Sequence, residues 1–136
     1  MAGQNQLPTP LMASFITCDG ILVHEKTHSR QLMNPKCKYD RLRFPDNVLL
    51  SLYVEITGGR GAYRPGLTLA NSEDQTIWEW HPERSFNISN PLITFDISFN
   101  DLNIRIPCAG RYLLALQLNE VHVAQRSLWF DLEKAH

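Results

Sequence analysis

The feature that most constrains this chain is a period-two alternation of apolar residues that recurs along its length. In the segment 48–57, every second position is apolar, namely Val48, Leu50, Leu52, Val54 and Ile56. Successive side chains of a β-strand point to opposite faces of a sheet, so such a segment buries one face. The same spacing occurs in 93–99 and 112–118. Since no segment shows a convincing helical pattern, we expect an all-β protein.

The C-terminal part predicts a hairpin with a shift in register. The dipeptide 119–120 separates two apolar runs and has the length of a tight hairpin turn. In that register Leu116 faces Val123 across the pair. The apolar phase then changes downstream, which predicts a β-bulge between Ala124 and Leu128.

Turn signals at intervals of roughly ten residues separate the apolar runs, as in many sandwiches. We therefore predict an antiparallel β-sandwich, immunoglobulin-like or similar, with about 7–9 strands. The length of 136 residues suits one domain. We assign 11–136 to that domain and 1–10, which is polar with two prolines, to a flexible tail. The segment 24–47 is less regular, and within it 31–33 and 39–44 could form short strands.

Composition narrows the classes of function. The formal net charge of -1 argues against a non-specific nucleic-acid binder, which would carry a basic excess. The 3 cysteines form neither a disulfide framework nor a zinc-binding spacing. We see neither a signal peptide nor an apolar run long enough for a membrane span. We therefore expect a cytoplasmic protein without metal, cofactor or membrane contact.

Three stretches carry a resemblance to a known family: "ASFITCDGILV" at 13–23, "FP" at 44–45 and "PCAGRYLLALQLNEVHVAQRSLWFDL" at 107–132. Together they resemble a bacterial family of small uncharacterised cytoplasmic β-sandwich proteins, known as a domain of unknown function. The resemblance runs from about Ala13 to Leu132. It implies a fold, and it implies no catalytic or binding residue.

Two tryptophans in "TIWEWH" are the most conspicuous candidates for binding. On a strand Trp78 and Trp80 share a face and lie roughly 7 Å apart. If exposed, they form a stacking platform for a sugar, and if buried, they belong to the core, which we favour. Glu79 and His81 share the opposite face and could pair as acid and base, although no nucleophile lies near them in the sequence.

The glycine-rich segment 58–66, "GGRGAYRPG", lacks the ending of a phosphate-binding loop. Its Arg60, Tyr63 and Arg64 could form a recognition tip, since loops on a rigid sheet scaffold often bind ligands. A plain hairpin loop is the favoured alternative. For Cys18 a buried structural role outweighs a catalytic one.

The favoured function is a non-catalytic β-sandwich module that binds a protein partner or self-associates. Exposed sheet edges support it, as does the mixed apolar and cationic segment 32–44, which shows no clear core phase. The alternative is a small-ligand, carbohydrate-like binding module that uses Trp78 and Trp80. We predict no enzyme activity.

Overall fold

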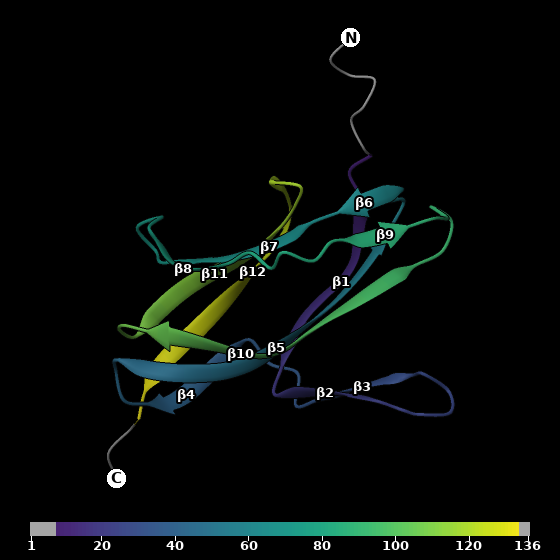
Figure 1. Cartoon of the computed structure of the whole chain (residues 1–136). Helices are drawn as coiled ribbons and strands as arrows, with labels where there is room; N and C mark the ends of the chain where they lie inside the picture. The colour runs from purple at the N-terminus through teal and green to yellow at the C-terminus, as the bar shows by residue number, and fades with distance from the viewer. Residues whose placement is uncertain (1–7, 134–136) are drawn as a thin grey trace.

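This computed structural model describes residues 8–133, and these residues form an all-β structure (Figure 1). They form twelve strands in four sheets and contain no helix, so the prediction of an all-β protein is confirmed. None of the four sheets closes on itself. The strands outnumber the about 7–9 that we predicted, because short strands occur in segments with no regular apolar pattern.

The largest sheet has five strands in the order β4-β12-β11-β7-β8. Their bounds are β4 (Lys38–Leu42), β12 (Val121–Leu132), β11 (Gly110–Leu118), β7 (Pro65–Ala70) and β8 (Thr76–Trp80). All its neighbours pair antiparallel except β4 and β12, which are parallel. The arrangement is therefore not wholly antiparallel as predicted, because β4 adds to the sheet beside a strand far from it in the chain.

A second sheet has three strands in the order β1-β5-β10. Their bounds are β1 (Leu11–Cys18), β5 (Asp46–Thr57) and β10 (Phe95–Ile106). Two small antiparallel sheets complete the fold: β2 (Gly20–Val23) with β3 (Arg30–Met33), and β6 (Gly61–Tyr63) with β9 (Phe86–Ile88).

One hydrophobic core joins the two larger sheets. In β5 all five alternating apolar residues are buried, as their spacing predicts. The five-stranded sheet contributes Leu67, Leu69, Tyr112, Leu114, Leu116, Leu118, Leu128 and Phe130. A fully buried side chain of this size stabilises the fold by about 1.5–3 kcal/mol, so these alternating runs are the main source of stability.

The segment 24–47 contributes to this core, contrary to our interpretation of 32–44. Tyr39 is 5% exposed and its ring stacks on Phe130 with 5.2 Å between centroids. Leu42 and Phe44 pack against the core. The segment therefore fills one side of the interior, and its mixed composition is no sign of a binding surface.

The C-terminal hairpin forms with a two-residue turn, as predicted. Asn119 and Glu120 both have positive φ, 53° and 67°, as a type I′ turn requires. The bulge lies earlier than predicted, because Val123 is the extra residue and Leu116 lies opposite Ala124. Val123 packs against the core, which explains why the apolar phase changes at this point.

The start of the described chain contacts the rest of the fold. The carbonyl oxygen of Pro8 accepts a hydrogen bond of 2.6 Å from the hydroxyl of Tyr63, and Pro10 is buried. Residues 1–7 of the tail that we predicted lie outside the described residues. Across 8–133, no helix has the length and apolar character needed to span a bilayer.

Candidate functional site

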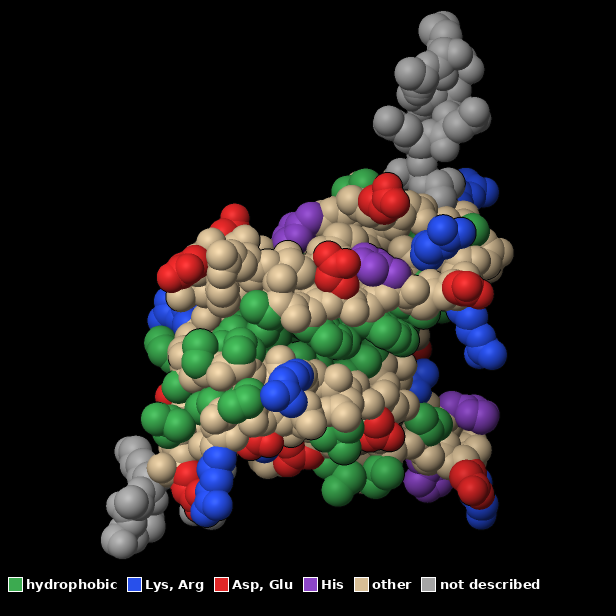
Figure 2. Space-filling model, turned by 60° about the vertical axis from the view of Figure 1, so that its left-hand side comes forward, with side chains coloured by type: hydrophobic (Ala, Val, Ile, Leu, Met, Phe, Trp, Pro, Cys, Tyr) green, Lys and Arg blue, Asp and Glu red, His purple; other side chains and the backbone are tan. Residues whose placement is uncertain are grey.

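The two tryptophans of β8 share a face, as predicted, but that face is turned toward the core. Trp78 lies opposite Leu69 and Trp80 opposite Leu67, and both leucines are fully buried. Trp80 meets Phe99 edge to face at 5.5 Å between centroids. The pair packs along an open side of the core. Figure 2 shows a band of hydrophobic side chains that crosses this view of the molecule. The packing on buried leucines agrees with the core role that we favoured, and Trp80 keeps 37% of its surface exposed. The sugar platform stays a prediction.

The opposite face of β8 carries the polar residues that form the candidate site. Nε2 of His81 lies 3.6 Å from Oε2 of Glu79, so these two side chains lie side by side on one face, as expected. Thr68 of β7 is the register partner of Glu79. The imidazole of His81 packs over Gly66, where a Cβ atom would lie 2.7 Å from Nδ1. The close approach of the ring therefore requires glycine at this position.

The amide of Gln117 on β11 lies beside this group. Gln117 is the register partner of Gly66, and its Nε2 donates a hydrogen bond of 3.2 Å to Oγ1 of Thr68. Its Oε1 is buried and has no hydrogen-bond partner among the described residues. Because the hydroxyl of Thr68 can donate or accept, either orientation of the amide leaves one end unpaired. A buried polar atom without a partner is costly and is uncommon in native proteins.

The other end of the site is built on the turn between β11 and β12. Oδ1 of Asn119 accepts a hydrogen bond of 2.8 Å from the backbone N–H of Arg64. Its Nδ2 donates one of 3.2 Å to the carbonyl oxygen of Ala62. Asn119 thus ties the turn to the link between β6 and β7. Among the described residues, the exposed side chains of Arg64 and Glu120 have no ion-pair partner.

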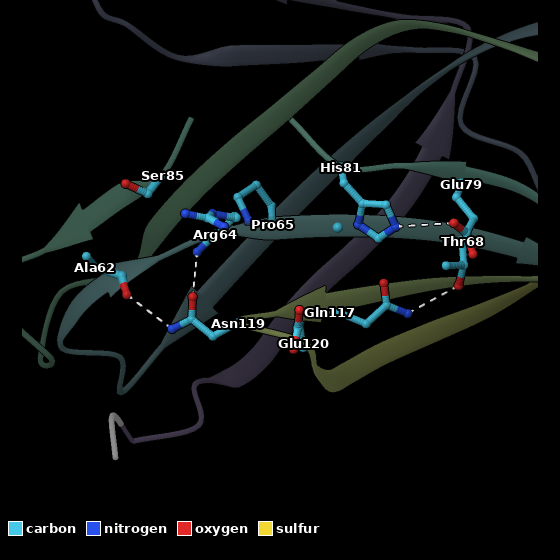
Figure 3. A pocket seen from close by; sticks show the side chains of 11 residues that line it. Ala62, Arg64, Pro65, Thr68, Glu79, His81, Ser85, Gln117, Asn119 and Glu120 are labelled. Carbon is cyan, nitrogen blue, oxygen red and sulfur yellow. Dashed lines mark hydrogen bonds and ion pairs between the residues drawn. The ribbon is translucent and has the colours of Figure 1, made fainter. Parts of the chain in front are cut away.

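These side chains surround a hollow of about 700 Å³ on the outer side of the five-stranded sheet (Figure 3). Pairing of β7 with β8 ends at Leu67 and Trp80, so the chain from His81 onward leaves the sheet and opens the space. Small-molecule pockets measure about 300–1,000 Å³. The lining residues are Ala62, Arg64, Pro65, Gly66, Thr68, Glu79, His81, Ser85, Gln117, Asn119 and Glu120.

The three residues predicted from the glycine-rich loop do not act together. Tyr63 is 2% exposed, and its hydroxyl accepts a hydrogen bond of 2.9 Å from the N–H of Arg60. Its ring stacks on Phe86 at 5.8 Å. Tyr63 therefore organises the loop, and Arg60 is exposed outside the hollow. Arg64 alone of the three lines the hollow.

Sequence reasoning missed Thr68, Gln117 and Asn119. A signal was present, because Thr68 and Gln117 occupy outward positions in otherwise apolar alternating strands. The two residues are neighbours only because β7 pairs with β11. The periodicity of a sequence does not show which strands pair when they lie far apart in the chain.

Cys18, which we weighed for catalysis, and His24 lie outside the hollow. Cys18 is fully buried, and its burial raises the pKa of the thiol, which fits the structural role that we favoured. His24 lies in the loop between β2 and β3, where Nδ1 accepts hydrogen bonds of 3.3 Å from the N–H groups of Lys26 and Thr27. Within residues 8–133 no group of side chains has the arrangement of a metal site.

Among the solved structures that match this chain, we describe a distant one. No family model matches the chain, and no curated protein matches it, so the resemblance to the bacterial family stays a prediction. The structure is similar to that of the Pseudomonas fluorescens alkylpurine DNA glycosylase AlkC bound to DNA containing an abasic site analog, with a TM-score of 0.43 and 11% identity. The match covers 70% of this chain and 28% of the glycosylase chain, so this chain spans less than a third of that protein's length.

These comparisons require a correction of the function that we favoured. We predicted a non-catalytic module that binds a protein partner or self-associates, whereas a solved structure that resembles this one is that of a DNA glycosylase bound to DNA. No comparison points to a protein-interaction module, and we withdraw that prediction. At this TM-score and identity, the likeness also gives this chain neither the activity nor the ligand of the glycosylase.

Proposed function

We propose that this chain binds a small polar molecule in the hollow formed by β7, β8, β11 and the segment after β8. The observation that carries the proposal is the buried amide of Gln117, which has one end unpaired at the wall of a space large enough for a ligand. A ligand that completes this hydrogen bond removes the penalty for an unsatisfied buried group. The site differs in place and residues from the tryptophan platform that we predicted, and the proposal includes no catalytic step.

The chemistry of the lining favours a polar ligand over an apolar one. Thr68 and Ser85 present hydroxyl groups, Glu79 presents a carboxylate and Arg64 a guanidinium. A few convergent polar groups of this kind fix the orientation of a bound molecule and supply specificity. The rigid sheet below them keeps Thr68 and Gln117 at a fixed separation, because both lie on paired strands.

The test is a screen of small polar molecules by two-dimensional amide NMR on the full chain. The set would contain amino acids, polyamines, dicarboxylic acids and nucleosides. We expect at least one compound to shift the amide signals of Gly66, Thr68 and Gln117. Gln117→Leu should weaken that compound about tenfold or more, which corresponds to ~1.4 kcal/mol. Gln125→Leu on β12 is the matched control, since Gln125 is exposed and lies outside the hollow.

Two results would contradict this proposal. One is that no compound in the set shifts signals of the hollow. The other is that Gln117→Leu and Gln125→Leu bind the compound as tightly as the unaltered chain does.

We also propose that the two larger sheets form a β-sandwich of the immunoglobulin-like or a similar type. The single core that they share supports a sandwich, because two sheets that pack face to face enclose their apolar side chains in this way. The resemblance to the bacterial family supports a cytoplasmic setting for the protein.

A further inference from the structure

We infer that the ligand of this hollow is a small zwitterion, with an ammonium group at one end and a carboxylate at the other. The inference rests on the proposed function and specifies the class of ligand. Its basis is the separation of opposite charges within one pocket. In Figure 3, Arg64 and Glu79 lie toward opposite ends of the group, and His81 and Gln117 lie between them.

The end near Glu79 is suited to a cationic donor. Among the described residues, the ion-pair partner of Oε2 of Glu79 is the imidazole of His81, at 3.6 Å, which is longer than a good hydrogen bond. The unpaired Oε1 of Gln117 is a second acceptor on the same wall. An ammonium group carries three donors and no acceptor, so it can pair with the carboxylate of Glu79 and still has donors for a second acceptor.

The end near Arg64 is suited to a carboxylate. The backbone of Arg64 is held by Asn119, which fixes the origin of the side chain at the edge of the hollow. Its guanidinium has no ion-pair partner among the described residues. Guanidinium groups bind carboxylates through two parallel hydrogen bonds, a geometry that they also use for phosphates.

A ligand with both groups would use both ends, whereas a simple amine or acid would use one. The free Glu120 adds a second carboxylate to the lining, so an acid without an ammonium group meets net repulsion. The hollow of about 700 Å³ leaves room for a chain of several carbon atoms between the charged groups.

The experiment compares matched probes by amide NMR titration of the full chain. The first set is 4-aminobutyrate, butylamine and butyrate, and the second is 6-aminohexanoate, hexylamine and hexanoate. We expect one zwitterion to bind at least tenfold more tightly than its matched amine and acid. Arg64→Gln should reduce its affinity to that of the amine, and Glu79→Gln to that of the acid. Arg60→Gln is the control, because Arg60 is exposed outside the hollow.

Two outcomes would overturn the inference. In the first, an amine binds as tightly as its zwitterion, or Arg64→Gln leaves the discrimination intact. In the second, none of the six probes binds. If compounds of the broader screen still shift signals of the hollow, the inference fails while the proposed function stands. If those compounds also fail to bind, both are refuted.

Discussion

Replacing Gly66 by alanine should disturb the hollow without unfolding the protein. A Cβ atom at this position would lie 2.7 Å from Nδ1 of His81, 3.1 Å from its Cε1 and 3.4 Å from Oε1 of Gln117. An ordinary contact between such atoms is about 3.5 Å. The imidazole must therefore move away by roughly 0.8 Å, and it can do so because its side chain is 58% exposed.

The expected change in stability is small because two terms oppose each other. Alanine in place of glycine in a strand favours folding by about 0.5–1 kcal/mol, since the unfolded chain loses freedom. Displacing the imidazole of His81 from Glu79 removes an exposed contact that contributes at most about 1 kcal/mol. The free energy of unfolding should thus change by less than about 1 kcal/mol. Binding of the polar ligand should weaken about tenfold or more, which is ~1.4 kcal/mol.

Thermal unfolding and the NMR signals of the His81 ring measure the two effects separately. Gly20→Ala is the matched control, because its Cβ would meet only Sδ of Met33, at an ordinary 3.8 Å. A fall in the melting temperature of more than about 10 °C would show that the imidazole of His81 does not move away from the new Cβ atom. Unchanged ring signals and unchanged binding would refute the described packing of His81 on Gly66.

Leu116→Ala in β11 should lower the free energy of unfolding by about 2–5 kcal/mol in urea denaturation, because the side chain is fully buried. Tyr63→Phe should cost about 1–2 kcal/mol by the same measurement, since it removes the hydroxyl that bonds Arg60 and Pro8. Tyr39→Phe should be nearly neutral, as its hydroxyl has no geometric partner among the described residues. Burial raises the pKa of Tyr39 to about 12, so only about a tenth of this phenol should absorb as phenolate at pH 11. The hydrogen bond from Arg30 lowers the pKa of Asp96. The stability that this pair contributes is therefore present at neutral pH and is lost as the pH falls below about 4. Asp96→Asn should flatten that part of the acid unfolding curve.

The period-two pattern predicted the core of this fold in detail. The five alternating residues of β5 are all buried, and the two-residue turn at Asn119 forms as expected. The bulge was placed too late because Val123 is apolar and fits either register until its pairing is known. Segment 24–47 was predicted in part, because strands lie near 31–33 and 39–44 as β3 and β4. The place of β4 in the fold could not be predicted, since its partner, β12, lies far away in the chain.

The candidate site was predicted only in part, because the sequence pattern does not show which strands pair. Neighbours within one strand follow from spacing, and so the shared face of Glu79 and His81 was predicted, and the two side chains are found 3.6 Å apart. Neighbours across strands depend on topology. Thr68 and Gln117 come together only because β7 pairs with both β8 and β11, and no local pattern indicates that arrangement.

The two faces of β8 have the roles that we favoured, with the tryptophans on the core side and Glu79 on the other side. Alternation placed Trp78 and Trp80 on one face and Glu79 on the other, but it did not say which face is inside. The buried partners Leu67 and Leu69 settle the matter, because they bring the tryptophans to the core side of the sheet. The polar face then lies outside, where the chain leaves the sheet after β8. Cross-strand packing of the tryptophans on the leucines stabilises the sheet edge, and because successive side chains of a strand point to opposite faces, Glu79 points outward.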